Sequence, residues 1–423
     1  MNDKTRDFIE KNLGDDIRQL ALKGCRDKEV DFDIALRQIA GRQTARRKLP
    51  SWAALDGIIY PPHLNMEQCS SEQTARYKAS ICQRLLPKTS NLKSTTSNLL
   101  DLTGGFGVDF AFMSEAFNEA TYVERNSELF AISSKNMILL VPKAKCINAD
   151  GMEVLRTTDH VSMIFMDPAR RDNQGARTYG ISDCTPNVLE MKEELLQKAD
   201  IVMLKLSPML DWHKAICDLG EEYVKEVHIV SVQNECKELI EVLSAKYTPK
   251  LCSLATDGTQ GVSSESGLKV ICTNILTDNN YELFEFSPSA HHALPNTPHL
   301  VLNTSHFLYE PNASIMKAGC FEEIAQAFNV SQLAPNSHLF TSEILVDDFP
   351  GRKFQIQAIS SMNKQELKEA LKDIKKANIS VRNFPMSVAE LRKKLKISEG
   401  GNDYIFATTL AEGKKVLIIC QHL

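Results

Sequence analysis

The most informative stretch of the chain is Leu99-Leu100-Asp101-Leu102-Thr103-Gly104-Gly105-Phe106-Gly107-Val108-Asp109. An apolar run typical of a buried strand ends here in a glycine-rich turn, and a helical pattern begins directly after the turn. Glycines at such a junction let the backbone approach a ligand closely, while the helix N-terminus faces it. The stretch therefore predicts a strand-turn-helix unit that binds a ligand.

Short apolar runs alternate with helical patterns on both sides of this unit. Buried strands separated by helices are typical of a mostly parallel sheet that is covered on both faces. The sequence thus predicts an α/β fold, a doubly wound Rossmann-like sheet. The predicted strands are 98–102, 120–124, 145–148, 162–166, 201–206, 226–232 and 268–275, and the predicted helices between them are 108–116, 128–139, 186–197 and 237–246.

The flanking regions have other patterns. The N-terminal part is helical, with apolar positions three and four apart over 31–47 and a second helix over 71–86. Order is lost from residue 279 to 311, a loop-rich stretch with four prolines. A small α+β domain then follows. We predict four parts: a helical N-terminal region (1–90), the α/β domain (91–277), a loop-rich segment (278–340) and the α+β domain (341–423).

Within the last part, the pattern from residue 352 onward is compact, because strand-like and helical stretches of ordinary length alternate without long gaps. The predicted elements are a strand over 354–360, a helix over 364–377, a strand over 379–383, a helix over 387–395, and strands over 404–410 and 415–420.

Composition limits the setting in which the protein works. The 423 residues, 43% hydrophobic and 24% charged, give room for about three domains with ordinary cores. Residues 1–16 are charged throughout, and no apolar run is long enough to span a membrane. The 11 cysteines form no Cys-x-x-Cys pair, which favours reduced thiols. We expect a cytoplasmic protein without membrane contact or obligate protein partner.

The glycine-rich turn does not fit a dinucleotide. A dinucleotide site prefers Gly-x-Gly-x-x-Gly, and the third glycine, counted from Gly105, would fall on Phe110. S-adenosylmethionine has no phosphate, suits a wider turn and brings an ammonium group that Asp101 can meet. The turn residues expected near this cofactor are Thr103, Gly104, Gly105 and Gly107.

Acidic residues also follow the next two predicted strands. Glu124 can accept both ribose hydroxyls, and Asp150 can accept from the adenine amino group, with Gly151 packing near the ring. The alternative is that these are ordinary solvated acids at strand ends, since ligand crevices and loops share that edge of the sheet. Turn, spacing and acids together favour S-adenosylmethionine as the cofactor.

These motifs resemble a known family. Residues 101–107, Glu124, Asp150 and Asp167-Pro168 are similar to the motifs of class I S-adenosylmethionine-dependent methyltransferases over about residues 70 to 275. Stretches 309–312 and 378–401 further resemble a bacterial group that joins this domain to a small ferredoxin-like piece and a C-terminal THUMP-like domain. Since THUMP domains belong largely to transfer-RNA-modifying enzymes, the resemblance implies an RNA substrate, tRNA or rRNA.

The predicted fourth strand ends at Asp167-Pro168, followed by Ala169 and Arg170. In amino-methylating enzymes the pattern is Asp/Asn-Pro-Pro-aromatic, so Ala169 and Arg170 depart from it. A guanidinium can stack on a base or bind a phosphate, but a solvated salt bridge is the plainer alternative. A 5-methylpyrimidine mechanism needs a nucleophilic cysteine, which the end of the fifth strand lacks.

Ribose 2′-O-methyltransferases of this fold use a Lys-Asp-Lys-Glu tetrad. Residues in the matching predicted elements are Lys78, Asp167, Lys205 and Glu235. A lysine with a depressed pKa could deprotonate the ribose hydroxyl. Lysines and acids are common, so the alternative is that Lys78 and Glu235 are only surface or fold residues.

Positive charge is segregated to the flanks. Residues 364–396 hold ten Lys or Arg and four acids, although the whole chain carries a net charge of -5. A second basic patch consists of Arg37, Arg42, Arg46, Arg47 and Lys48. Such runs are often solvated helix faces, but two basic patches beside an acidic domain also fit capture of an RNA backbone. The residues expected to contact RNA are Arg46, Arg47, Lys375, Lys376, Arg392, Lys393 and Lys394.

Four histidines gather in a proline-rich loop, at His291, His292, His299 and His306. Without close Cys or acidic ligands they do not predict a zinc site, and we expect no metal. Two rivals to an RNA methyltransferase stay open. One is a methyltransferase of small molecules or proteins, and the other is a non-catalytic RNA-binding protein that keeps the fold.

Overall fold

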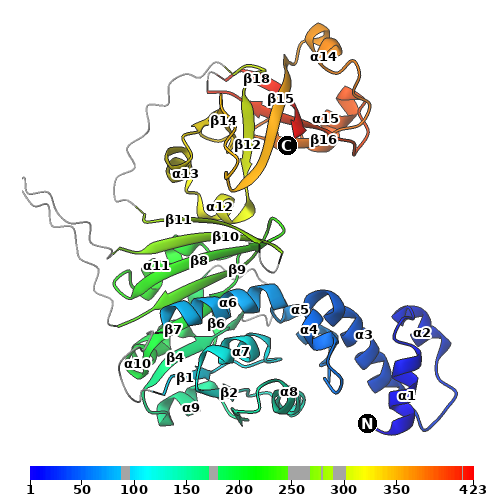
Figure 1. Ribbon diagram of the computed structural model, residues 1–423, viewed down its shortest axis with the longest axis vertical. Coiled ribbons are helices and arrows are strands. Elements are labelled where there is room, and N and C mark those ends of the chain that lie inside the picture. Colours follow the sequence, from blue (N-terminus) through cyan, green and yellow to red (C-terminus); the bar gives the residue numbers. More distant parts are fainter. Residues whose placement is uncertain (87–95, 171–179, 246–266, 278–279, 289–301, 412) are drawn as a thin grey trace, which may run out of the picture. The chain divides into compact units, whose positions relative to one another are not determined.

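The computed structural model describes residues 1–86, 96–170, 180–245, 267–277, 280–288, 302–411 and 413–423 (Figure 1). The chain forms two compact units. The first comprises Met1–Val227 and Glu238–Leu268, and the second comprises His228–Lys237 and Lys269–Leu423. No helix in these described ranges is long and apolar enough to cross a membrane.

The N-terminal region of the first unit is helical. Both long helices begin at a capping residue: the Asp31 carboxylate accepts from Ile34 N, and the Ser71 hydroxyl accepts from Thr74 N. Each cap satisfies a backbone N–H that has no partner inside its helix. The helices are α1 (Asp3–Lys11), α2 (Ile17–Lys23), α3 (Phe32–Lys48), α4 (Pro50–Ala53), α5 (His63–Gln68) and α6 (Glu72–Leu85).

One sheet contains the strand order β8-β9-β7-β4-β1-β2-β3. Five neighbouring strands, β7 through β3, are parallel, whereas β9 is antiparallel to β7. The antiparallel strand β9 distinguishes this sheet from the sheet of dinucleotide-binding domains, whose strands are parallel. The strands are β1 (Asn98–Asp101), β2 (Glu119–Val123), β3 (Ala144–Ile147), β4 (Val161–Met166), β7 (Ala199–Leu206), β8 (Val224–Val232) and β9 (Glu235–Leu243).

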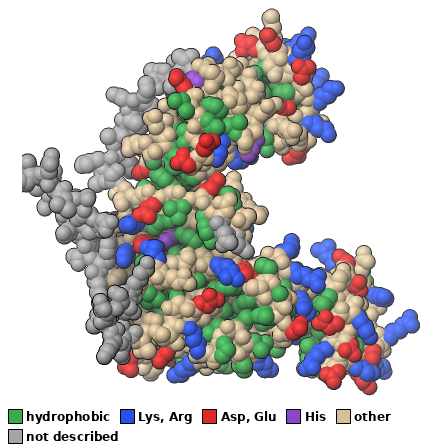
Figure 2. All heavy atoms as spheres, in the orientation of Figure 1, with side chains coloured by type: hydrophobic (Ala, Val, Ile, Leu, Met, Phe, Trp, Pro, Cys, Tyr) green, Lys and Arg blue, Asp and Glu red, His purple; other side chains and the backbone are tan. Residues whose placement is uncertain are grey.

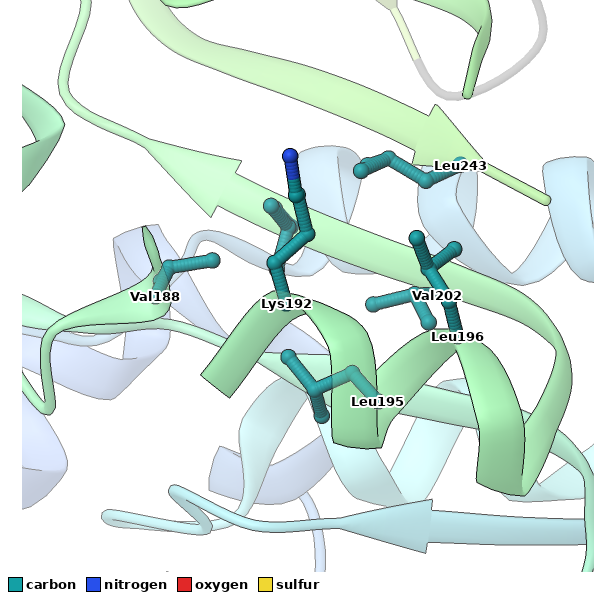
Figure 3. A pocket seen from close by; sticks show the side chains of 7 residues that line it. Val188, Lys192, Leu195, Leu196, Val202 and Leu243 are labelled. Carbon is teal, nitrogen blue, oxygen red and sulfur yellow. The ribbon is translucent and has the colours of Figure 1, made fainter. Parts of the chain in front are cut away.

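Helices cover both faces of this sheet. Successive residues of β7 point to opposite faces, and Lys205 contacts Asp109 on α7, whereas Leu204 lines a small apolar pocket against α10 (Figure 3). The doubly wound fold is thereby confirmed. The helices between the strands are α7 (Val108–Met113), the 3-10 turn η1 (Ser114–Ala116), α8 (Ser127–Leu140), α9 (Gly151–Thr157), the 3-10 turn η2 (Ile181–Asp183), α10 (Val188–Lys198) and α11 (Trp212–Leu219).

The helix predicted over 237–246 is wrong, because these residues belong largely to strand β9. Gln233 and Asn234 have positive φ angles of 48° and 63°, the conformation of a tight hairpin turn, so the chain reverses into a second strand. Glu238 and Glu241 of this strand are buried. Two acids three positions apart are typical of the solvated face of a helix, so Glu238 and Glu241 favoured the wrong prediction.

The second unit contains a strand pair and a sheet. Strands β10 (Lys269–Thr277) and β11 (Asn280–Phe286) form an antiparallel pair, and a separate seven-stranded sheet has the order β13-β14-β12-β15-β18-β17-β16. Order is therefore not lost from residue 279, as the prolines suggested, because β11 and β12 lie within that stretch. The strands of the second sheet are β12 (Phe307–Pro311), β13 (Ser331–Gln332), β14 (Phe340–Ser342), β15 (Gly351–Ser361), β16 (Asn378–Arg382), β17 (Asp403–Thr409) and β18 (Lys415–His422).

Each face of the seven-stranded sheet has its own apolar core. Phe354, Phe406 and Ile418 belong to one core, and Leu391, Ile405 and Leu417 to the other. The strands predicted from residue 354 onward are confirmed, but the helix predicted over 364–377 ends at Ala370. The helices of this unit are α12 (Ala313–Ala318), α13 (Phe321–Ala327), α14 (Lys364–Ala370) and α15 (Val388–Leu395).

The buried Glu241 carboxyl predicts an unusual pH dependence of stability. Among the described residues neither of its oxygens has a hydrogen-bond partner, and burial, with a contribution from Asp218, raises its pKa to about 8 from 4.5. The unfolded chain loses this proton near pH 4.5 while the folded chain keeps it to about pH 8, so stability falls as the pH rises between these values. Glu241→Gln removes this loss.

We expect the stability gained by Glu241→Gln over the wild type to grow between pH 5 and pH 8, by about 2–4 kcal/mol. Scanning calorimetry of both proteins at several pH values measures it. The exposed Glu153 serves as the control position, where Gln should leave the pH dependence unchanged. Parallel stability curves for Glu241→Gln and wild type would contradict the assignment.

Candidate functional site

The glycine-rich turn between β1 and α7 is pressed against β2 and α8. A β carbon at Gly104 would lie 2.1 Å from the ring of Tyr122, and one at Gly107 would lie 2.3 Å from the methyl group of Met137. Gly107 also has a φ of +86°, which favours glycine. Only glycine fits at these two positions, which lets the turn pack closely on β2 and α8.

Asp101, the last residue of β1, is a buried carboxylate with an exposed fraction of 1%. Its Oδ1 accepts a hydrogen bond of 2.9 Å from Thr103 N, and within the described part of the chain no cationic side chain pairs with it. Burial raises the pKa of Asp101 well above its usual value, and the negative charges of Asp109, Asp167 and Glu124 raise it further. Such a group favours a positively charged ligand.

Glu124 follows β2 and holds the turn from the other side. Its Oε2 accepts from Gly105 N at 2.9 Å, and its Oε1 accepts from Asn126 N at 2.7 Å. The Gly105 carbonyl in turn accepts from the hydroxyls of Tyr122 and Ser133. Each carboxylate oxygen keeps a further lone pair for a ligand hydroxyl. Turn and carboxylate therefore form one hydrogen-bonded unit.

Asp150 and Gly151 lie at the start of α9. Asp150 is exposed and caps the helix by accepting from Met152 N at 2.8 Å. A β carbon on Gly151 would lie 2.5 Å from the Leu102 carbonyl oxygen, so this helix begins directly against the chain that leads into the turn. The adenine contact assigned to Asp150 stays a prediction, since capping also accounts for the residue.

Asp167 follows β4 and is joined to the turn through the backbone. Its N–H donates to the Thr103 hydroxyl at 2.7 Å, and Pro168 after it is buried. Arg170 lies in the two-residue strand β5 (Ala169–Arg170), which pairs with β6 (Cys184–Thr185). The side chain of Arg170 lies outside the described residues, so its role stays a prediction.

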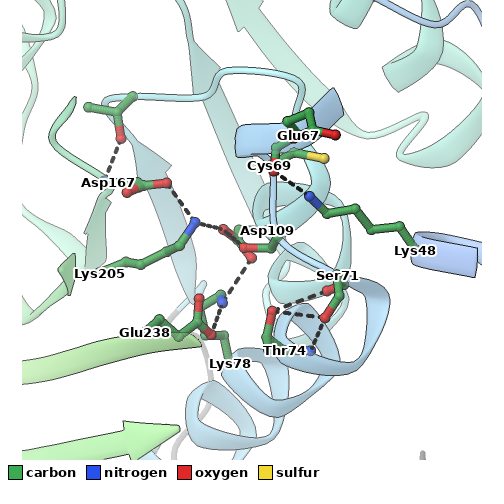
Figure 4. Close-up of polar contacts among 12 residues, drawn as sticks. Lys48, Glu67, Cys69, Ser71, Thr74, Lys78, Asp109, Asp167, Lys205 and Glu238 are labelled. Carbon is green, nitrogen blue, oxygen red and sulfur yellow. Dashed lines mark hydrogen bonds and ion pairs between the residues drawn. The ribbon is translucent and has the colours of Figure 1, made fainter. Parts of the chain in front are cut away.

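A chain of alternating charges leads inward from Asp167 (Figure 4). The Lys205 ammonium lies 2.7 Å from Asp167 Oδ2 and 3.3 Å from Asp109 Oδ2. The Lys78 ammonium lies 3.1 Å from Asp109 Oδ1 and 2.5 Å from Glu238 Oε1. The structure thus brings together three of the four residues of the predicted tetrad, with Asp109 between the two lysines.

Glu235, the fourth predicted member, does not join them. Its side chain is 73% exposed and pairs with Lys237 at 2.7 Å, whereas Glu238 contacts Lys78. The difference of three residues arises from the prediction of a helix where β9 is a strand. Sequence reasoning also missed Asp109, although a lone charge in the apolar run Val108–Met113 was a signal that it is paired.

The charges around Lys205 argue against a lysine base. Burial lowers the pKa of Lys205, but Asp167, Asp109 and Glu238 together outweigh burial and hold that pKa well above its usual value of 10.5. The expectation of a depressed lysine pKa is thus contradicted for Lys205. The residue is an ammonium ion that orients Asp167.

The basic residues predicted to contact RNA lie mostly at the surface. Arg46 and Arg47 are exposed in the last turn of α3. Lys393 and Lys394 are exposed on α15, and Figure 2 shows Lys and Arg side chains gathered near α14 and α15. Lys375 and Lys376 are exposed after α14.

Arg392 differs from these residues, because it is half-buried and donates to the Ala377 carbonyl at 3.1 Å. Part of its guanidinium therefore holds the domain together. Of the histidines, His291, His292 and His299 lie outside the described residues. His306 is buried, and its Nε2 lies 3.8 Å from Glu343.

Comparison with known proteins agrees with this fold. Residues 351–422 match the model of the THUMP domain-like family, and residues 307–350 match that of a ferredoxin-like domain. The crystal structure of a "putative methyltransferase from Porphyromonas gingivalis W83" aligns over 100% of this chain and 99% of its own, with 29% identity and a TM-score of 0.80. No protein with a curated description matches the sequence.

Other solved structures match smaller parts. A SAM-dependent methyltransferase of Agrobacterium tumefaciens is 16% identical over 41% of this chain and 62% of its own, with a TM-score of 0.28. An rRNA methylase of Streptococcus thermophilus is 10% identical over 40% of this chain and 93% of its own, with a TM-score of 0.29. Scores this low support no conclusion about the chain.

The fold and the matched domains define the class of protein. The chain has a methyltransferase-type α/β domain, a helical N-terminal region, and ferredoxin-like and THUMP-like domains at its C-terminal end. The resemblance inferred from the sequence motifs is confirmed at this level.

The buried Asp101 carboxyl should destabilise the protein that has no ligand. The pKa of Asp101 is raised in the folded protein, so folding favours the protonated carboxyl. The protein is therefore most stable, as far as this group is concerned, below the usual pKa of 3.8, and it loses stability as the pH rises above that value. Asp101→Asn keeps an oxygen for Thr103 N and removes the charge. We expect its unfolding midpoint at pH 7 to be higher than that of the wild type, as measured by scanning calorimetry.

The control is Asp150→Asn, because Asp150 is exposed and Asn caps a helix as well as Asp does. This variant should leave the unfolding midpoint unchanged. A midpoint for Asp101→Asn well below that of the wild type would show that the carboxylate stabilises the fold and would contradict the argument.

Proposed function

We propose that this protein transfers a methyl group from S-adenosylmethionine to a structured RNA, tRNA or rRNA. The observation that carries the proposal is the convergence of Asp101, Glu124 and Asp167 on one glycine-rich turn, at the carboxyl ends of three neighbouring parallel strands. Ligands of open α/β sheets bind at this edge. The cofactor is cationic and carries a ribose, and three carboxylates suit it.

The residues present fit this cofactor. Asp101 is unpaired in the described part of the chain and accepts from the ammonium group, while Glu124 accepts from the ribose hydroxyls. Gly104 and Gly107 hold the turn beside these carboxylates, because side chains at these positions would collide with Tyr122 and Met137. The cofactor supplies an electrophilic methyl group when bound.

On the acceptor side, Asp167 is the residue available to the substrate. Its side chain is 40% exposed, and the Lys205 ammonium binds Oδ2 and leaves Oδ1 for the acceptor. Asp167 accepts a hydrogen bond from the group to be methylated and takes up or passes on its proton. Lys205 holds this carboxylate in place through its contact with Oδ2.

The basic surface supports RNA as the substrate. Lys375, Lys376, Lys393 and Lys394 are exposed in the part that matches the THUMP-like model, and none of them needs to hold the fold as Arg392 does. Exposed cations gathered on one small domain suit a phosphate backbone.

Mass spectrometry of digested RNA tests the function directly. A strain without the protein should lack one methylated nucleoside, and the wild-type gene should restore it. Asp167→Ala should fail to restore it, while the purified variant keeps its affinity for S-adenosylmethionine within a few fold, because Asp167 addresses the acceptor. RNA of identical composition in both strains would contradict an RNA substrate.

The THUMP-like domain should bind RNA through charge. If about four of its lysines and arginines neutralise phosphates, the slope of log K against log salt should be near -3 to -4, at about 0.7–0.9 per contact. Replacing Lys393 and Lys394 by Glu should weaken RNA binding at low salt and flatten the slope, as measured by fluorescence anisotropy with the full-length protein.

The matched control is Lys11→Glu with Lys23→Glu, which reverses one exposed charge of α1 and one of α2 outside the predicted RNA patches. Its net charge changes equally, so a specific patch should leave this slope unchanged. Negligible RNA binding by the wild type at about 50 mM salt, or equal effects of both double variants, would favour a small-molecule or protein substrate.

A further inference from the structure

The charged network behind Asp167 has a graded burial. The exposed fractions of the side chains are 0% for Lys78, 4% for Glu238, 10% for Asp109, 12% for Lys205 and 40% for Asp167. The network thus starts in the interior and reaches the surface at the residue that we place against the acceptor.

Such a network is a poor device for stability alone. Removing charges from water is costly, and well-packed apolar side chains of the same volume often give equal or greater stability. Buried ion pairs do, however, define geometry, because each charge has few positions in which it is compensated. The arrangement therefore suits the orientation of a functional group.

Asp109 is the junction of this network. Its Oδ2 accepts from the Ser70 hydroxyl at 2.7 Å and from Lys205 at 3.3 Å, and its Oδ1 forms the ion pair with Lys78. Lys78 is held in turn by Glu238. Asp109 is thus held by Lys78 of α6 and by Ser70, which lies two residues before α6. Asp109 in turn holds Lys205 in place.

Asp109 also belongs to the cofactor side of the site. It is the second residue of α7, which starts at Val108 directly after Gly107, and burial of α7 fixes its distance from the turn. The turn therefore reaches Asp167 by two routes: through the Thr103 hydroxyl and through Asp109 and Lys205. Both routes fix the position of the Asp167 carboxylate relative to the methyl donor.

We propose that Asp109 is a positioning residue. It holds the Lys205 ammonium against Asp167 and thereby fixes the position of the Asp167 carboxylate, which binds the acceptor group. The proposal rests on the function proposed above for Asp167. Asp109 itself contacts neither substrate nor cofactor, and it acts only through Lys205.

The pKa of Lys205 distinguishes a positioning role of Asp109 from a merely structural one. The ionisable groups that face its amine are Asp167 from the end of β4, Asp109 from α7 and Glu238 from β9, with Cys69, Lys78 and Asp101 next to them. Asp109→Asn removes one of the three anions. The Lys205 pKa should therefore fall, and the alkaline limit of the rate, where Lys205 loses its proton, should move to lower pH.

The experiment uses full-length Asp109→Asn with three measurements. NMR titration of labelled lysine side chains, assigned with Lys205→Met, should show the Lys205 pKa lower by about one unit or more. On the RNA substrate, kcat should fall on the order of 10- to 100-fold. The alkaline limb of the rate should shift in the same direction, with KM for S-adenosylmethionine within a few fold.

Glu72→Gln is the matched control, because Glu72 is an equally buried carboxylate on α6 that bonds Ser51 and Arg76 instead. It should lower stability but shift neither the Lys205 pKa nor the rate profile. Ser70→Ala, which removes one hydrogen bond from Asp109, covers the case that Asp109→Asn does not fold, and it should lower kcat several-fold.

The proposal would be overturned if the Lys205 pKa is unchanged in Asp109→Asn, or if kcat is unchanged in Ser70→Ala. If the wild type methylates no RNA, the proposed function fails, and the NMR titration alone still decides whether Asp109 sets the state of Lys205. If the wild type methylates RNA and Asp109→Asn keeps its kcat and pH profile, the function stands and the positioning role is wrong.

Discussion

The close approach of the glycine-rich turn to the ring of Tyr122 is the constraint on which the rest of the site depends. At Gly104 there is no room for a side chain, and the hydroxyl of Tyr122 binds the carbonyl of Gly105. β2 therefore supports the turn, and Glu124 after β2 closes it. The start of α7, and with it the place of Asp109, follows from the turn.

Charge at this edge of the sheet is unevenly compensated. Asp109 and Glu238 are matched by Lys78 in the interior, and Lys205 matches Asp167 near the surface. Asp101 has no such partner in the described residues, and burial raises its pKa. The buried Asp101 carboxyl therefore lowers the stability of the protein. Such a cost is common at functional sites, and a cationic ligand that pairs with Asp101 would offset it.

Much of the fold could be predicted, because its signals are local. Glycine spacing, apolar runs and capping residues such as Asp31 and Ser71 report on neighbouring residues only. The hairpin at Gln233 and Asn234 gave no such signal, since neither residue is glycine. The strand after the hairpin was therefore predicted as a helix, and Glu235 was named in place of Glu238.

The candidate site divides in the same way. Asp101, Glu124 and Asp167 could be named because each ends a strand with a recognisable pattern. Asp109 was missed because an acid in the first turn of a helix is ordinarily explained by the helix dipole, although its place in an apolar run was a signal that it is paired. Its contacts to Lys78 and Lys205 join residues far apart in the sequence, and only the tertiary fold reveals them.

The central claim is that the turn and its carboxylates bind S-adenosylmethionine, and a calorimetric titration tests it most directly. The wild type should bind S-adenosylmethionine but not NAD. Asp101→Asn and Glu124→Gln should each weaken binding by about 1.5–3 kcal/mol, the usual worth of a hydrogen bond to a charged group. Binding of NAD without S-adenosylmethionine, or full affinity in both variants, would contradict the account.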